Sequence, residues 1–102
     1  MTTVARSPNL TAPEARRRLA HERDSRLTQL SAIEAGAALA DKELSSAQAA
    51  AIRRVLTEIS AAEDRVADGT YGACQRCGSG IPVERLEILP YARYCVGCQQ
   101  KS

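Results

Sequence analysis

Four cysteines in two pairs place the strongest constraint on how this 102-residue chain can fold. The pairs are Cys74 with Cys77 and Cys95 with Cys98, which gives the spacing C-x2-C-x17-C-x2-C. This spacing closely matches the four-cysteine pattern of zinc sites. Two residues between paired thiolates let each pair form a tight turn around a metal ion, and nearby glycines permit the backbone of such a turn. The sequence therefore predicts that all four cysteines bind one Zn²⁺ ion.

A site made of four thiolates has no vacant coordination position. Catalytic metal sites keep one position open for water or substrate, so this pattern indicates a structural zinc. Iron in a rubredoxin-like centre is compatible with the two knuckles. Thiol redox chemistry is a further alternative, but two C-x-x-C pairs without a βαβ pattern favour zinc. The chain has no recognisable pairing of a nucleophile with a base and no glycine-rich phosphate loop, so we expect no enzymatic activity.

Composition explains why such a chain needs a metal. Hydrophobic residues make up 44% of it, but 18 of them are alanine and there is no Phe or Trp. Large side chains are therefore too scarce for a conventional core, and zinc binding can supply folding free energy of order 10 kcal/mol. No stretch approaches the roughly 18 apolar residues of a membrane span, and the first residues lack the apolar region of a secretory signal. We expect a cytoplasmic protein without a membrane partner, and in that reducing compartment paired cysteines are more typical of metal sites than of disulfides.

The segment before the cysteines predicts two long helices. Thr11 and Glu14 fit a capping box at the start of the first helix, which we expect to span about residues 12 to 35. Between residues 14 and 68 there is no proline, and Gly36 is the only glycine. This pattern favours a bend near Gly36 between two helices. The first helix has a loose apolar stripe that we expect to be buried, formed by Leu19, Leu27, Leu30 and Ile33.

The second helix has a clearer stripe and its own end signals. Ser45 and Gln48 form a second capping-box pattern, and Asp68 precedes Gly69, which we expect to be the left-handed residue after the helix. The expected buried stripe runs through Leu44, Ile52, Val55, Leu56, Ile59, Ala62 and Val66. A short connection would fold the two helices into an antiparallel coiled-coil hairpin. A plain dimerisation coiled coil, or one long helix through Gly36, is the alternative.

The chain thus divides into three parts. We expect residues 1 to 10 to form a disordered arm, and residues 11 to 69 to form the coiled-coil hairpin with its tip near residues 36 to 44. Residues 70 to 102 would form the four-cysteine zinc-finger module. The expected fold class is mainly α: an antiparallel two-helix coiled-coil hairpin joined to a small four-cysteine zinc-finger module.

Residues around the cysteines extend the metal pattern into a longer signature. Its members are Gly69, Tyr71, Gly72, Cys74, Cys77, Gly78, Ile81, Arg85, Leu86, Pro90, Cys95 and Cys98. In this order and spacing they resemble the zinc-finger signature of the DksA/TraR family. The signature covers about a third of the chain, and the expected hairpin is similar to the family architecture over most of the rest.

The resemblance implies a bacterial transcription regulator. Members of the family bind RNA polymerase directly, without contacting DNA, and insert the coiled-coil tip through the secondary channel towards the catalytic centre. Members active on initiation typically carry two tip aspartates in the motif D-x-x-D-x-A, which this sequence lacks. Asp41, Glu43 and Glu34 remain as candidates for tip contacts, and the same residues are equally typical of ordinary charge on a solvated loop.

Some family members also bind the alarmone guanosine tetraphosphate, together with polymerase, through basic groups near the zinc module. The position before Pro90 and the one after Cys98 are basic in such members, but here they are Leu89 and Gln99. Two charge-assisted contacts to an anionic ligand would be lost. We therefore expect the direct dependence on guanosine tetraphosphate to be weak or absent.

Two other functions remain open from the residues alone. A nucleic-acid-binding zinc ribbon is one, but the net charge of +2 and the pI near 8.5 are mild for such a protein. A zinc-thiolate redox sensor is the other, in which oxidation of the thiolates would eject the metal and unfold the module.

Overall fold

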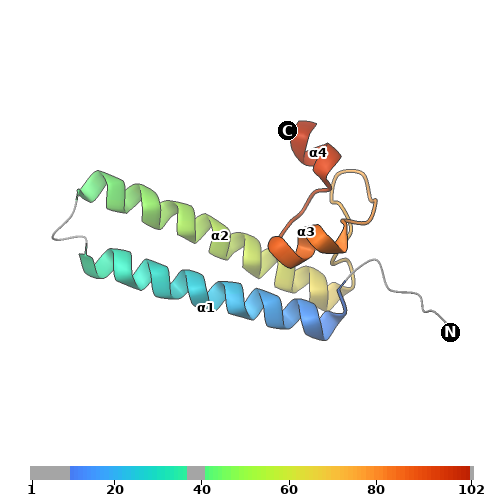
Figure 1. The fold of residues 1–102 in the computed structure, drawn as a ribbon, viewed down its shortest axis with the longest axis horizontal. Helices are drawn as coiled ribbons and strands as arrows, with labels where there is room; N and C mark the ends of the chain where they lie inside the picture. The colour runs from blue at the N-terminus through green and yellow to red at the C-terminus, as the bar shows by residue number, and fades with distance from the viewer. Residues whose placement is uncertain (1–9, 37–40, 102) are drawn as a thin grey trace.

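The computed structural model describes residues 10–36 and 41–101, and helices dominate them. Two long helices run antiparallel as a hairpin, and two short helices lie near one end of it (Figure 1). The helices are α1 (Ala12–Gly36), α2 (Lys42–Asp68), α3 (Val83–Ile88) and α4 (Val96–Lys101). We call the hairpin end beside α3 the base and the opposite end the far end. The molecule measures 58 × 30 × 22 Å, so the hairpin sets its long dimension.

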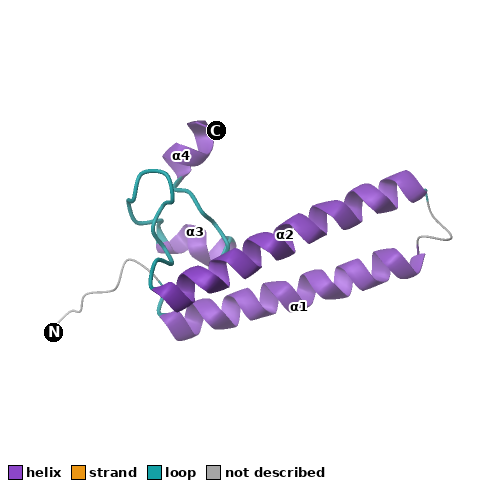
Figure 2. Cartoon of the chain, turned by 180° about the vertical axis from the view of Figure 1, so that it is seen from behind, coloured by secondary structure: helices purple, strands orange, loops and turns teal. Residues whose placement is uncertain are grey.

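This arrangement confirms the expected fold class. Viewed from behind, the loops and short helices gather at the base, while among the described residues the far end carries α1 and α2 alone (Figure 2). The described residues form no β-strand, and their β-structure is limited to an isolated antiparallel bridge between Ala73 and Gly80. Within the same residues, no helix is long and apolar enough to cross a membrane.

The start of α1 has the local chemistry that the sequence indicates. The Thr11 amide donates to Glu14 Oε1 at 3.3 Å, and the Glu14 amide donates to Thr11 Oγ1 at 3.3 Å. These reciprocal bonds satisfy amides that a helix start leaves without partners, which confirms the capping box. The hydrogen bonds from Thr11 also lower the pKa of Glu14, because they favour its ionised form.

The start of α2 differs from the sequence-based expectation. The helix begins at Lys42, and the Asp41 carboxylate accepts hydrogen bonds from the amides of Glu43 (2.8 Å) and Leu44 (3.1 Å). Ser45 lies inside the helix and is buried, so the predicted cap at Ser45 is wrong. The physical reason is that Asp is as good an N-cap as Ser, and the earlier of two competing caps adds a further turn of helix.

The end of α2 agrees with the expectation. Gly69 has a φ of 84°, the left-handed conformation that glycine adopts without steric cost. The next two amides, of Thr70 and Tyr71, both donate to the Arg65 carbonyl, at 2.9 and 3.1 Å. The chain therefore leaves the helix in a fixed direction, towards the first cysteine pair.

Two small hydrophobic clusters hold the base together. The first lies between the long helices and contains Ala15, Leu19, Ile59, Ala62 and Val66. The second lies in the cysteine module and contains Cys74, Ile81, Leu86 and Cys98. Leu10 and Tyr71 pack against both clusters. These two side chains join the module to the hairpin.

Burial along the hairpin corrects part of the predicted stripe. Leu19 is fully buried as expected, but Leu27 is 47% exposed and Leu44 is 58% exposed. Leu30 and Ile33 are half-buried. Which face of a helix becomes covered depends on how it packs against its partner, and the periodicity of one helix alone does not determine this.

Part of the expected organisation lies outside the described residues. These are residues 1–9 of the predicted arm and residues 37–40 of the predicted tip. Leu10, which the sequence placed in the arm, packs against both clusters of the base. Residues 42 to 44, which the sequence placed in the tip, form the first turn of α2.

Candidate metal centre

The first cysteine pair sits in a tight turn held by backbone hydrogen bonds. The Gly78 amide donates to the Cys74 carbonyl at 2.9 Å, and the Cys74 amide donates to the Ser79 carbonyl at 2.7 Å. Gly78 has a φ of 79°, so the turn uses a left-handed residue directly after Cys77. The turn brings the Cys74 and Cys77 side chains to the same side.

The second pair sits at the start of α4. Cys95 immediately precedes the helix and Cys98 lies in its first turn. The Gln99 amide donates to the Cys95 carbonyl at 2.9 Å, which extends the helical pattern back to the first ligand. A further bond, from the Gln75 amide to the Arg93 carbonyl at 2.8 Å, ties the loop of one pair to the approach of the other.

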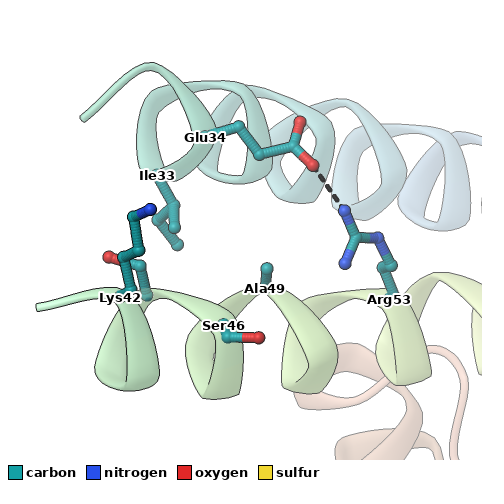
Figure 3. Close-up of a pocket in the computed structure, with 7 residues that line it drawn as sticks. Ile33, Glu34, Lys42, Ser46, Ala49 and Arg53 are labelled. Carbon is teal, nitrogen blue, oxygen red and sulfur yellow. Dashed lines mark hydrogen bonds and ion pairs between the residues drawn. The ribbon is translucent and has the colours of Figure 1, made fainter. Parts of the chain in front are cut away.

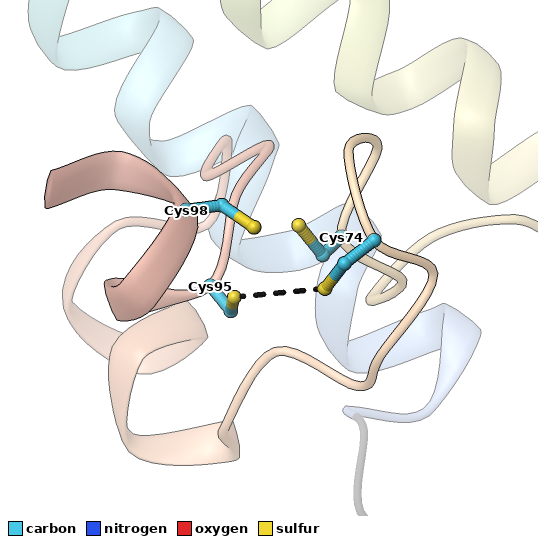
Figure 4. A group of neighbouring side chains, drawn as sticks. Cys74, Cys95 and Cys98 are labelled. Carbon is cyan, nitrogen blue, oxygen red and sulfur yellow. Dashed lines mark hydrogen bonds between the residues drawn. The ribbon is translucent and has the colours of Figure 1, made fainter. Parts of the chain in front are cut away.

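The four sulfur atoms are grouped tightly enough for one metal ion. All lie within 4.8 Å of one another, and the Cys77 and Cys95 Sγ atoms are 3.8 Å apart (Figure 4). A tetrahedral zinc site with Zn–S bonds of about 2.3 Å requires sulfur separations of about 3.8 Å. A disulfide would need about 2.05 Å, and all four cysteines are free. The arrangement therefore positions the four cysteines to bind one metal ion and fits a four-thiolate zinc site.

The cluster has a buried side and an open side. Cys74 and Cys98 are 3% and 8% exposed, and they form part of the module's hydrophobic cluster. Cys95 is half-buried and Cys77 is exposed. A metal held here would be shielded by Ile81 and Leu86 on one side and would be reached by solvent through Cys77.

Ionisation of the thiols shows why a cation belongs in the cluster. Burial disfavours the Cys74 thiolate, but hydrogen bonds from nearby backbone amides outweigh burial and lower the pKa of Cys74 to about 6. The hydrogen bond with Cys95, followed by burial, raises the pKa of Cys98 to about 12. Thiolates this close repel one another, so the four cannot ionise together unless a positive ion neutralises them.

Polar contacts attach the module to the hairpin. The Tyr71 hydroxyl donates to the Pro90 carbonyl at 2.8 Å, and burial raises the pKa of Tyr71 to about 12. Two ion pairs reach from the module to the long helices: Glu87 to Arg18 on α1 at 3.9 Å, and Arg93 to Glu58 on α2 at 3.3 Å. These contacts fix how the metal centre sits on the base of the rod.

A surface hollow of about 630 Å³ lies between the module and α2. Both positions singled out for the alarmone, Leu89 and Gln99, line this hollow. The same hollow contains Arg93, whose guanidinium is paired with the Glu58 carboxylate. Sequence reasoning missed Glu58, because its distance of some 30 residues from Leu89 gives no local signal.

The three candidate tip residues have different surroundings at the far end. Glu34 forms an ion pair with Arg53 on the facing helix (Figure 3). Asp41 is exposed, but its carboxylate caps α2. Glu43 is exposed in the first turn of the same helix. The sequence did not reveal Arg53 as the partner of Glu34, because that pairing depends on the register of the two helices.

The fold and the site together define a class of protein. Its members have an antiparallel helical hairpin with a four-cysteine zinc finger at its base. Residues 69–102 match the prokaryotic DksA/TraR C4-type zinc finger. This match confirms the resemblance to the zinc-finger signature that was seen in the sequence.

Similar proteins agree with the assignment. General stress protein 16O of Bacillus subtilis is 49% identical over 47 residues, which are 46% of this chain and 29% of that protein. An RNA polymerase-binding transcription factor DksA of Caulobacter vibrioides is 39% identical over 49 residues, which are 48% of this chain and 34% of that protein. The chain thus matches about a third of the length of these curated relatives.

The fold extends the likeness beyond the zinc finger. The structure of transcription factor DksA2 from Pseudomonas aeruginosa superimposes with a TM-score of 0.53 at 24% identity, covering 88% of this chain and 75% of that one. At this identity the likeness shows a shared overall fold and nothing further.

Proposed function

We propose that this protein is a non-enzymatic transcription regulator that binds bacterial RNA polymerase. In this proposal the hairpin enters the secondary channel with its far end directed towards the catalytic centre, and a structural zinc holds the base. The observation that supports the proposal most strongly is a DksA/TraR zinc finger at the base of a long antiparallel hairpin. Residues 74, 77, 95 and 98 would hold the metal, which neutralises the thiolates and fixes the module.

The shape of the hairpin suits insertion into a narrow channel. α2 has 27 residues, so it reaches about 40 Å at 1.5 Å per residue. Of residues 10–36 and 41–101, the far half of the rod contains parts of α1 and α2 and no other element (Figure 2). Acidic groups at its end would interact with cationic groups near a magnesium-dependent catalytic centre. Direct contact with DNA is not required by this mode of action.

Glu43 and Asp41 are the acidic residues that we assign to tip contacts. Glu43 is exposed, and Asp41 exposes its side chain while capping the helix. Glu34 is the weaker candidate, because Arg53 already engages its carboxylate. The capping role also dictates the choice of variant, since an alanine at position 41 would fray α2 as well as remove charge.

A binding and transcription assay with matched variants tests the proposal. The tip variant is Asp41→Asn with Glu43→Gln, which removes two charges while asparagine keeps the cap. The control is Asp64→Asn with Glu84→Gln, the same chemical changes at exposed residues away from the far end. We expect all three zinc-loaded proteins to be retained on core polymerase, and only the tip variant to lose its effect on transcription.

The outcomes separate binding from regulation. If the parent protein fails to bind core polymerase at micromolar concentration, the proposed function is wrong. If the tip variant alters transcription as the parent does, the role of the two acidic residues is wrong while polymerase binding stands. Retention on DNA that weakens steeply with salt would instead favour a nucleic-acid-binding zinc ribbon.

We also propose that guanosine tetraphosphate has little direct effect on this protein. Leu89 and Gln99 carry no positive charge, and the Arg93 guanidinium in the same hollow is already paired with the Glu58 carboxylate. Transcription with the bound protein should therefore respond equally with and without the alarmone. A double variant, Leu89→Arg with Gln99→Lys, should gain a response, and a strong response of the parent would overturn the proposal.

A further inference from the structure

Large buried side chains are confined to the base half of the hairpin. The two largest fully buried residues of the long helices are Leu19 and Ile59, which belong to the same cluster. Beyond Leu19, α1 continues for 17 residues to Gly36 without another buried residue. Leu27 is 47% exposed, and Ile33 is only half-buried. The apolar seam of α1 therefore weakens towards the far end.

The facing part of α2 does not compensate. Its buried residues on the far side of Ile59 are Ser45 and Ala49, both small. Near the far end a hollow of about 350 Å³ opens between the helices, lined by Ile33, Ala49 and their neighbours (Figure 3). Each atom that faces such a space lacks the packing contacts of a filled core. We call residues 27–36 of α1 with residues 42–53 of α2 the outer half.

Electrostatic contacts across the outer half are weak. The Glu34–Arg53 ion pair joins the two helices, but its side chains are 52% and 56% exposed. Exposed pairs of this kind add little stability, because water solvates both charges and the long side chains lose entropy when they pair. The ion pair of Arg23 with Glu63 also joins α1 to α2, but it lies on the base side of Leu27.

We infer that the outer half of the hairpin opens locally while the base stays folded and keeps its metal. Local opening is easiest where few apolar groups are buried, and here the buried apolar groups lie at the other end. Once separated, each helix segment of the outer half loses its tertiary packing, which supplies most of the stability of a helix in a protein, so it frays and its amides exchange with solvent. The opening is a property of the free chain and does not depend on the proposed polymerase binding.

Hydrogen exchange on the full zinc-loaded chain tests this inference. We expect the amides of residues 28–35 and 47–53 to be protected at least about 100-fold less than those of residues 18–22 and 59–66. Exchange in the outer half should be nearly independent of low denaturant concentrations, as local opening exposes little surface, whereas exchange in the base should accelerate. Equal protection along both halves would overturn the inference.

A pair of alanine variants provides the matched control. Ala49 is 6% exposed and faces the hollow, while Ala47 is exposed on the same helix. Ala49→Leu adds apolar atoms in the hollow and should raise protection of the outer half about tenfold, with no change in the base. Ala47→Leu has the same effect on helix propensity and should leave protection unchanged. Equal effects of the two variants, or no effect of Ala49→Leu, would contradict underpacking as the cause.

Discussion

Two leucines on α1 that look equivalent in the sequence should differ sharply in their contribution to stability. Leu19 is fully buried, whereas Leu27 is 47% exposed. Leu19→Ala removes three carbon atoms from the core, at about 0.8 kcal/mol each, and the cavity left behind brings the expected loss in unfolding free energy to about 3 to 4 kcal/mol. In Leu27→Ala only about half of this hydrophobic free energy is lost, because the side chain is half exposed, and no closed cavity remains. The expected loss in unfolding free energy is therefore about 1 kcal/mol.

Urea unfolding followed by far-ultraviolet circular dichroism, with zinc in excess, measures both values. Helix propensity cancels in the comparison, because each variant replaces leucine by alanine inside the same helix. With a urea dependence of about 1 kcal/mol per molar, the two midpoints should differ by roughly 2 M. Similar midpoints would refute the burial pattern described for α1, and a larger loss for Leu27→Ala would place the core on the other stretch of the helix.

Three further predictions concern the ends of the rod and its metal. Chelation of zinc should abolish the near-ultraviolet signal of the tyrosines around the module, and an unchanged signal after stoichiometric zinc release would contradict a structural role for the metal. Thr11→Ala should cost about 1 kcal/mol of unfolding free energy in urea titrations, and Thr11→Ser, which keeps the cap, should cost clearly less. Because burial raises the pKa of Tyr71 from 10 to about 12, its contribution to stability should be intact below pH 10 and should be lost as pH rises towards 12. The ionisation of Tyr71 is measured by subtracting the phenolate absorbance of Tyr71→Phe from that of the parent across a pH titration. If the difference shows a tyrosine that titrates near pH 10, Tyr71 is not buried as described.

Features that depend on a few neighbouring residues could be predicted from the sequence. The capping box requires only that Thr11 and Glu14 be three residues apart, and the stop after α2 requires only a glycine at position 69. The cluster of four cysteines could be predicted for the same reason, because each C-x-x-C pair forms its own turn. Such signals need no knowledge of how distant segments pack.

Features that depend on the register of the two helices could not be predicted from the sequence. Leu27 and Leu44 belong to the predicted apolar stripes, but both are exposed in the folded hairpin. The pairing of Glu34 with Arg53 likewise needs the loop length and the crossing of the helices. The start of α2 could not be predicted either, because Asp41 and Ser45 are both good N-cap residues. Only the folded chain shows that Asp41 is the one used.

A buried arginine at the junction of hairpin and module also escaped prediction. Arg65 is 7% exposed, burial lowers its pKa, and its Nη2 atom finds no hydrogen-bond acceptor in the part of the chain that the structure describes. Arginine in the last turn of a helix normally indicates a favourable charge at an exposed helix end. Here the module folds back over that turn, a long-range event with no local sequence signal.

The position of Leu10 in both hydrophobic clusters has a practical consequence for labelling the molecule. Leu10 and α4, the first and last described parts of the chain, both lie on the zinc side of the rod (Figure 1). A fluorophore, affinity handle or fused domain attached before Leu10 or after Lys101 would therefore emerge beside the metal module. Such an attachment would leave the opposite end of the hairpin unobstructed, whereas a probe for that end has to be introduced at an internal position of the chain.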